Sequence, residues 1–428
     1  MAIATSTTLS AILKTLYPKG NLPKEHVYAQ DPFVALVAKD SKFGGEAVKI
    51  PIQYRGGGNT GRTVAQAQAS TAPAGYRAFT ILAAQRTVRH AVAQWDRQAV
   101  RATMQGSDTA FVQAVKKEMD AQLYTLGRNL ARDVWGDGGG TLGQVLSGVG
   151  TPTITLANPD DIVNFDEGQI VQAADSNPGV INTGNVRVGS ATITAIDRSA
   201  GTLTISGNWT TAITSFTAGD FLFLQGDIDT NAFTVGGYGA RGIASWVPQV
   251  APGPTDSFYS VNRSVDATRL AGWRYNGQGQ SIEEVIQIMA AYIKREGGLV
   301  DYCFLSPRNW YRLSMSASTR SVFDISTGKK DFPFGFSGFK VTTAAGDVTV
   351  VAGPNVKSDR LYLINKASWT LRSLDPVPSM VTDDGNDYLR LGNANTFEAR
   401  MLYDMVLTCD MPGFNGVASL TPPTYLTT

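Results

Sequence analysis

The glycine-rich stretch YRGGGNTGRT, residues 54–63, lies one substitution away from a phosphate-binding motif. Gly56, four further residues, Gly61, Arg62 and Thr63 would form a P-loop if residue 62 were lysine. A P-loop turns backbone N–H groups and a helix N-terminus toward phosphate, and its lysine adds a compact ammonium group. Arg62 offers a planar guanidinium instead. The stretch therefore predicts either an altered nucleotide-binding loop or a flexible loop with another role.

The sequence on both sides of this loop favours a hairpin tip. In EAVKIPIQY, Val48, Ile50 and Ile52 alternate with polar residues and Pro51, which predicts a half-buried edge strand rather than the buried strand that precedes a P-loop. After the breaker STAPAG, the segment YRAFTILAAQRTVRHAV also has an extended pattern. We therefore expect a long two-stranded hairpin, which is marginally stable alone and needs a surface of its own chain or of a neighbour.

Few other residues are candidates for catalysis or ligand binding. The chain has two histidines, His26 and His90, and neither has a cysteine or a carboxylate at metal-ligand spacing. His90 alternates with valines, which predicts a partly buried structural role. Cys303 and Cys409 lie in apolar runs typical of strands, so we expect buried free thiols. We expect no catalytic residue, no metal and no cofactor.

Charge is nearly balanced, with 37 Lys and Arg against 36 Asp and Glu and a net charge of +1. The chain as a whole is therefore not an avid binder of polyanions. Basic charge concentrates at Arg86, Arg89, Arg97 and Arg101, which predicts either a salt-bridged face or a surface that meets phosphate or an acidic patch of a neighbouring subunit. The acidic cluster in residues 160–167 lacks the ligand spacing of a calcium loop and predicts a solvated loop.

The length of 428 residues predicts two or three domains. The N-terminus has no positive charge before its apolar stretch, and no apolar run approaches the ~18 residues of a membrane span. We therefore expect a soluble, cytoplasmic product with no membrane partner. Residues 1–45 mix Pro, Lys and short apolar pieces, which predicts an extended arm that docks on a partner surface.

Two helices are predicted from their periodicity. The first begins at Ser107 or Asp108, ends at the glycine run that starts at Gly136, and is roughly 39 Å long. Its apolar stripe consists of Phe111, Val115, Met119, Leu123, Leu126, Leu130 and Val134. The second helix, in SIEEVIQIMAAYIKREGG, has a capping box formed by Ser281 and Glu284. Both stripes predict helices that pack on one side against a sheet or another helix.

Strands dominate two other regions. From about residue 152 to residue 229 helical periodicity disappears and Thr, Ile, Val, Gly and Asp dominate, which predicts a small β-barrel or sandwich inserted into the main domain. The C-terminal third contains further strands, and the last one alternates over residues 397–409, a length of roughly 43 Å. Because this strand matches the first helix in length, we expect the two to pack together.

The order of these parts along the chain resembles the major capsid protein of tailed double-stranded DNA bacteriophages, which has the Hong Kong 97-type fold. EAVKIPIQY, its loop and its return are similar to the extended loop of that family, and DTAFVQAVKKEMDAQLYTLGRNLARDVWGDG resembles its spine helix. CFLSPRNWYRL resembles the strand–Pro–helix segment of the axial domain. TFEARMLYDMVLTCDMPGFNGVASL is similar to the closing strand of the peripheral domain.

The resemblance implies an α+β fold with a small all-β domain inserted into it. The implied parts are an N-terminal arm (1–45), an extended-loop hairpin (46–93), a peripheral domain with the spine helix (94–136 and 376–428), an axial domain (137–151 and 233–375) and an inserted β-barrel-like domain (152–232). Some members crosslink their loops through Lys and Asn. The tip here has Asn59 but no lysine, so we do not expect this crosslink.

The resemblance also implies a function that is structural and not enzymatic. Such a chain self-assembles, as pentamers and hexamers, into the icosahedral shell that encloses the phage genome. The implied partners are other copies of the chain, the portal, scaffold or decoration proteins, and packaged DNA on the inner face. The implied location is the virion, after assembly in the host cytoplasm. The candidate contacts between subunits are then Arg55, Gly56, Gly57, Gly58, Asn59, Arg62, Arg86, Arg89, Arg97 and Arg101.

Two alternative functions remain open at this point. A phage tail or surface adhesin would use residues 152–232 to bind glycans, although the shaft-like repeats of such proteins are not found in the sequence. A nucleotide-binding protein would use the P-loop-like stretch at residues 54–63.

Overall fold

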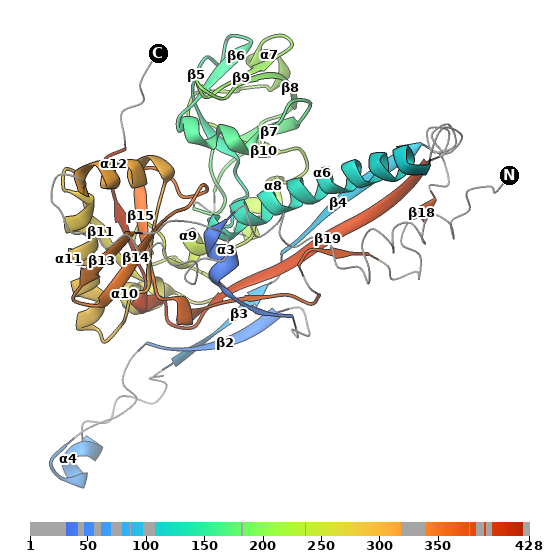
Figure 1. Ribbon diagram of the computed structural model, residues 1–428. Helices are drawn as coiled ribbons and strands as arrows, with labels where there is room; N and C mark the ends of the chain where they lie inside the picture. The colour runs from blue at the N-terminus through green and yellow to red at the C-terminus, as the bar shows by residue number, and fades with distance from the viewer. Residues whose placement is uncertain are drawn as a thin grey trace.

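A long helix-and-strand platform, a β-barrel and a mixed sheet make up this computed structural model (Figure 1). The barrel lies above one end of the platform, and the mixed sheet lies beside that same end. The structure describes residues 31–41, 47–54, 61–69, 79–85, 87–96, 108–180, 183–235, 237–317, 339–375, 377–381, 389–390 and 396–422.

The platform consists of helix α6 (Asp108–Trp135) and strands β4 (Thr87–Asp96) and β19 (Thr396–Cys409). The two strands pair antiparallel along the whole of β4, and α6 packs against both. As predicted, the apolar stripe of α6 faces this sheet. The side chains of Met119, Leu123, Leu126, Leu130 and Val134 share one core with Met401, Tyr403 and Met405.

Short strands complete the platform on the other edge of β19. These are β16 (Trp369–Arg372), β17 (Ser379–Met380) and β18 (Leu389–Arg390). Strand β1 (Ala38–Asp40) then pairs parallel with β16.

The described part of the predicted arm docks on its own chain. Helix α3 (Pro32–Leu36) begins at the N-cap Asp31, and the side chains of Phe33 and Val34 are buried in the platform core. Residues 1–30 and 42–45, the rest of the predicted arm, lie outside the described residues.

The predicted hairpin is formed by β2 (Ala47–Gln53) and β3 (Phe79–Gln85), which pair antiparallel in a two-stranded sheet. Val48, Ile50 and Ile52 are buried whereas Pro51 is exposed, so the predicted half-buried strand is confirmed. We expected residues 76–92 to form a single returning strand of the hairpin. Instead, this segment contributes to two different sheets. Strand β3 pairs with β2, and β4 continues alongside β19.

Six short strands form a closed barrel in the order β10-β5-β6-β9-β8-β7. They are β5 (Gly143–Ser147), β6 (Thr153–Leu156), β7 (Ile170–Ala174), β8 (Ala191–Asp197), β9 (Thr202–Ile205) and β10 (Phe221–Leu224). Two short helices, η2 (Pro159–Asn164) and α7 (Trp209–Ala212), lie between these strands in the chain. The barrel begins earlier than the predicted boundary at residue 152, because β5 pairs with β6 and β10.

The third part is a mixed six-stranded sheet in the order β11-β20-β15-β12-β14-β13. Its strands are β11 (Trp273–Asn276), β12 (Tyr302–Leu305), β13 (Phe339–Thr343), β14 (Gly346–Ala352), β15 (Arg360–Ile364) and β20 (Gly416–Ser419). Helices α11 (Ile282–Arg295) and α12 (Pro307–Ala317) cover it. As predicted, Ser281 caps α11 by accepting a hydrogen bond from Glu284 N.

This pairing departs from the predicted domain boundaries at two places. Strand β16 belongs to the platform although residue 375 was the predicted end of the axial domain. Strand β20 belongs to the mixed sheet although residues 376–428 were assigned to the peripheral domain. The division into domains of the resembled family stays a prediction.

The remaining short elements lie at the far end of the hairpin (α4) or in the connections within and between these three parts (the others). They are α4 (Val64–Ala69), α8 (Thr230–Val235), α9 (Ile243–Trp246), η3 (Arg263–Asp266), α10 (Ala267–Ala271), η4 (Lys366–Ser368) and η5 (Pro412–Phe414). Within the described residues, no helix has the length and apolar character needed to cross a membrane.

Candidate functional site

The glycine-rich loop leads into a short exposed helix. Residues 55–60 lie outside the described residues, and Gly61, Arg62 and Thr63 are exposed just before α4. Thr63 caps this helix, since its Oγ1 accepts a hydrogen bond from Gln66 N at 3.2 Å. In Figure 1, α4 lies beyond the end of β2 and away from the three main parts.

This geometry differs from that of a P-loop in two respects. The strand before the loop belongs to a two-stranded antiparallel sheet, not to a buried parallel sheet. The helix after the loop has six residues and is largely exposed, so it offers no long, buried helix N-terminus to a phosphate. The nucleotide-binding hypothesis is therefore not favoured.

The predicted basic cluster contains one described residue, Arg89, which is engaged within its own chain. Its Nε donates to Asp133 Oδ2 at 2.7 Å, and its Nη1 donates to Asp227 Oδ2 at 2.8 Å. Arg86, Arg97 and Arg101 lie outside the described residues. Arg89 thus follows the salt-bridged alternative, and a contact with a neighbouring subunit stays a prediction for it and for the other candidates.

Asp133 is the centre of a buried polar network between α6 and the platform sheet. Its side chain is 3% exposed and also accepts a hydrogen bond from Tyr403 Oη at 2.8 Å. Burial by itself raises the pKa of Asp133, but Arg89 and Arg132 outweigh burial and hold it below its ordinary value. Burial and the nearby carboxylate raise the pKa of Tyr403 well above its ordinary value. Asp133 is therefore a carboxylate and Tyr403 a neutral donor at neutral pH.

The outer face of β4 is more exposed than the sequence predicted. Val88 and Val92 are each 39% exposed, and His90 between them is exposed as well. The prediction of a partly buried His90 was therefore wrong. The side chains of β4 do alternate between two faces, as the sequence indicated. However, α6 covers the face that contains Ala93, and His90 lies on the other face. This outer face therefore carries two exposed valines together with the exposed polar side chains of His90 and Gln94.

Both cysteines are buried free thiols, as predicted. Burial raises the pKa of Cys303 and of Cys409, so both remain protonated and unreactive at neutral pH. Among the described residues, no cluster of three or more His, Cys, Asp or Glu side chains is arranged to bind a metal ion.

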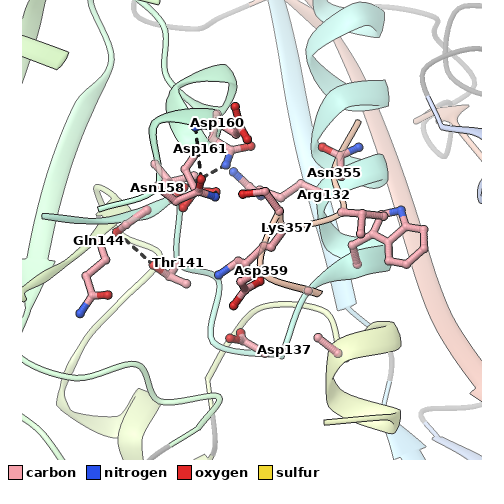
Figure 2. A pocket seen from close by; sticks show the side chains of 18 of the residues that line it. Arg132, Asp137, Thr141, Gln144, Asn158, Asp160, Asp161, Asn355, Lys357 and Asp359 are labelled. Carbon is pink, nitrogen blue, oxygen red and sulfur yellow. Dashed lines mark hydrogen bonds between the residues drawn. The ribbon is translucent and has the colours of Figure 1, made fainter. Parts of the chain in front are cut away.

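A cleft of about 380 Å³ lies between the barrel and the loop that precedes β15 (Figure 2). Asp160 and Asp161 line it from the barrel, and Lys357 and Asp359 line it from the loop. Arg308 at the start of α12 pairs with Asp160, with Nε and Oδ1 3.1 Å apart.

The prediction of a solvated loop for residues 160–167 is confirmed only in part, because Glu167 is exposed whereas Asp160 and Asp166 form ion pairs. Besides Asp160, Asp166 is paired with arginine, since Arg128 of α6 contacts both of its carboxylate oxygens. These pairs join residues distant in the sequence, so no local pattern could reveal them.

The geometry defines an α+β protein with an elongated platform, a projecting hairpin and a separate barrel. The structure described as "Cyanophage A-1(L) capsid asymmetric unit" contains a chain of similar fold, with a TM-score of 0.50 and 10% sequence identity. The likeness covers 94% of this chain and 95% of that chain. The protein therefore has a phage-capsid-like fold, and at this identity the likeness establishes the fold alone.

Weaker likenesses exist to other phage structures. A chain of Microbacterium phage Oxtober96 has a TM-score of 0.40 and 10% identity, covering 99% of this chain and all of that chain. A chain of Mycobacterium phage Adephagia has a TM-score of 0.39 and 9% identity, with the same coverage. TM-scores this low carry no argument. No protein-family model and no curated protein sequence matches this chain.

Proposed function

We propose that this chain is a major capsid protein, the repeating subunit of an icosahedral phage shell. The observation that carries the proposal is the likeness in fold to a chain of a cyanophage capsid, which extends over nearly the whole of both chains. In that reading the platform is the peripheral domain, α6 is the spine helix, the mixed sheet is the axial domain and the barrel is an insertion. The role is structural, and we expect no enzymatic activity.

The projecting hairpin supports this role. Its base packs on the core of its own chain through Ile50 and Ile52. Its far end carries α4, where Val64 is 75% exposed. A two-stranded hairpin with an exposed valine near its far end gains stability when another protein covers that end. A second copy of the chain supplies such a cover at every position of a closed shell.

The surface chemistry is compatible with many weak contacts between copies. A net charge of +1 causes little mutual repulsion among many subunits. The exposed face of β4 around Val88 and Val92 adds a second contact area at a distance from the hairpin tip. Contacts that are modest one by one become strong when several act at once in an assembly.

The partners and location follow from the proposed function. The chain would form pentamers and hexamers, join a portal, assemble with scaffold or decoration proteins, and face packaged DNA on the inside of the shell. It would assemble in the host cytoplasm and remain in the virion. The adhesin hypothesis has no comparable support in the geometry.

Assembly of the purified full-length chain tests the proposal. We expect sedimentation velocity to show capsomers or larger particles, and negative-stain electron microscopy to show closed shells or rings. If assembly requires a scaffold, co-expression with the neighbouring genes of the same phage supplies it. Only small monodisperse species under both conditions would overturn the proposal.

A further inference from the structure

The β-barrel has a hydrophobic core of its own. Its buried side chains, including those of Phe165, Leu203 and Trp209, form one cluster, and the platform and the mixed sheet have separate clusters. Trp209 and Phe216 stack inside the barrel with ring centroids 5.4 Å apart. A second apolar cluster joins β7 and β10 to α8 through Ala174, Phe223 and Phe233. The barrel and α8 therefore pack as one unit, and neither of their clusters is continuous with that of the platform or of the mixed sheet.

The chain enters and leaves the barrel through a neck of closely packed glycines. Gly237 has a φ of +93°, and a Cβ atom there would lie 2.1 Å from Gly138 O. A Cβ atom on Gly239 would lie 2.5 Å from Gly140 N. The two passages of the chain therefore touch backbone to backbone. Glycine has the widest choice of backbone torsions, and segments that absorb torsional change act as hinges.

Among the described residues, three ion pairs connect the barrel side to the rest of the molecule, and each has its arginine on the same side. Arg128 of α6 contacts Asp166 with both of its terminal nitrogens, including Nη1 to Oδ1 at 3.1 Å. Arg308 of α12 pairs with Asp160 at 3.1 Å. Arg89 of β4 pairs with Asp227, just after β10, at 2.8 Å. The platform and the mixed sheet with its helices are here called the body. In each pair the arginine belongs to the body, and the aspartate belongs to the barrel or to the segment just after its last strand.

The seat formed by these pairs is polar and partly solvated. Asp166 and Arg308 are 45% and 42% exposed. Beside them the cleft of about 380 Å³ lies between the barrel and the loop that carries Lys357, and the side chain of Asp160 is hydrogen-bonded to Ser358 of that loop. Ion pairs that are exposed to this degree are weakened by dissolved salt, unlike a buried apolar contact.

We propose that the barrel is a rigid body held in one orientation by these three ion pairs, and that it tilts about the glycine neck when they are broken. The separate core lets the barrel move without unfolding. The neck lets the two chain passages turn together. The cleft leaves room for the barrel to move toward the mixed sheet. This property belongs to the single chain and does not depend on assembly into a shell.

Distance measurement by pulsed electron paramagnetic resonance tests the proposal. Spin labels are attached at Val188→Cys on the barrel and Val265→Cys on the body, which replace side chains 75% and 69% exposed. The native cysteines are buried and do not compete for the label. If the chain assembles, labelled chains are diluted with unlabelled ones so that each distance arises within one chain.

The comparison is between the labelled parent and the variant Arg128→Gln/Arg308→Gln/Asp227→Asn, which removes all three ion pairs and leaves the contact of Arg89 with Asp133 in place. We expect one narrow distance distribution in the parent at low salt. We expect a shifted or at least twofold broader distribution in the variant, and in the parent at 1 M NaCl. The matched control is Arg187→Gln, which removes an ion pair with Asp220 within the barrel itself and should keep the parent's distribution.

Two results would overturn the proposal. One is an unchanged distribution in the variant when circular dichroism shows that it is folded. The other is an unchanged distribution of the parent at 1 M NaCl, which requires no substitution in the seat. Both results are independent of the sedimentation and microscopy that test the proposed function.

Discussion

Tyr403 Oη donates a hydrogen bond of 2.8 Å to Asp133 Oδ2, and thereby joins the centre of the long strand β19 to the last turns of helix α6. Arg89 of β4 donates to the same oxygen at 2.7 Å. One buried carboxylate oxygen thus connects the three long elements of the platform. The apolar stripe brings helix and sheet together, and this contact selects one register between them.

Removal of the hydroxyl in Tyr403→Phe should destabilise the protein by about 1–2 kcal/mol, because a buried charged acceptor loses a donor while its partner Arg89 remains. Urea unfolding followed by circular dichroism measures the change. Tyr311→Phe is the matched control, since Tyr311 is 61% exposed, and its effect should stay within about 0.5 kcal/mol. Equal effects of the two substitutions would contradict the structural role of this hydrogen bond.

Asp31 should make stability depend on pH. Burial raises its pKa to about 6, against hydrogen bonds from Asn355, Trp135 and the backbone that lower it. The Trp135 indole nitrogen lies 2.6 Å from Asp31 Oδ2. Because the folded state holds this proton more tightly than the unfolded state, the stabilisation is complete below about pH 4. It is lost as the pH rises toward 6.

The measurement compares the free energy of unfolding of the parent and Asp31→Asn across pH 4 to 7. The stability of the parent relative to the variant should fall by up to about 3 kcal/mol over this interval, since only the parent can ionise at this position. The comparison cancels the titration of all other groups. A difference between the two proteins that is constant with pH would show that Asp31 does not titrate in this range.

A methyl group should be tolerated less well at Gly237 of the glycine neck than at Gly226, which lies outside the neck just after β10. Gly237 and Gly226 both have positive φ, at +93° and +88°, but only Gly237 has a backbone atom in the place of a Cβ. Gly226→Ala carries the torsional cost alone, about 1–2 kcal/mol. Gly237→Ala adds steric overlap with Gly138 and should cost at least about 2 kcal/mol more. Thermal unfolding of both variants checks the order, and equal costs would show that the two chain passages are not in contact.

The hairpin tip should be needed for assembly and not for folding. Val64→Asp places a charge on the exposed apolar surface of α4, and we expect a tenfold or larger loss of assembled particles with an unchanged melting temperature. Val250→Asp is the matched control, because Val250 is also 75% exposed but belongs to a loop of the body. Sedimentation velocity measures the assembled fraction. Normal assembly of Val64→Asp would remove α4 from the proposed contact surface.

Periodicity predicted the elements that have a clear internal repeat. Helix α11 and its Ser281 cap, the stripe of α6 from Met119 to Val134, and the alternation of β19 are all present in the structure. The Asp-Pro dipeptide at residues 31–32 was a further usable signal, since Asp before Pro at a helix start is typical of an N-cap.

Contacts between distant residues could not be predicted in the same way. The sequence of β5 does not indicate that this strand pairs with β10, which lies about eighty residues later along the chain. The pairs Arg128–Asp166 and Arg89–Asp227 likewise join charges whose local surroundings resemble those of any solvated arginine or aspartate.

The sequence by itself determined which segments are helix or strand and which of their faces are apolar, because backbone geometry imposes a repeat of 3.6 or 2 on neighbouring residues. Only the tertiary structure decided which of those faces is covered. His90 lies on an alternating strand but stays exposed because α6 occupies the other side of β4. Burial depends on what packs against a face, and that partner comes from a distant part of the chain or from another molecule.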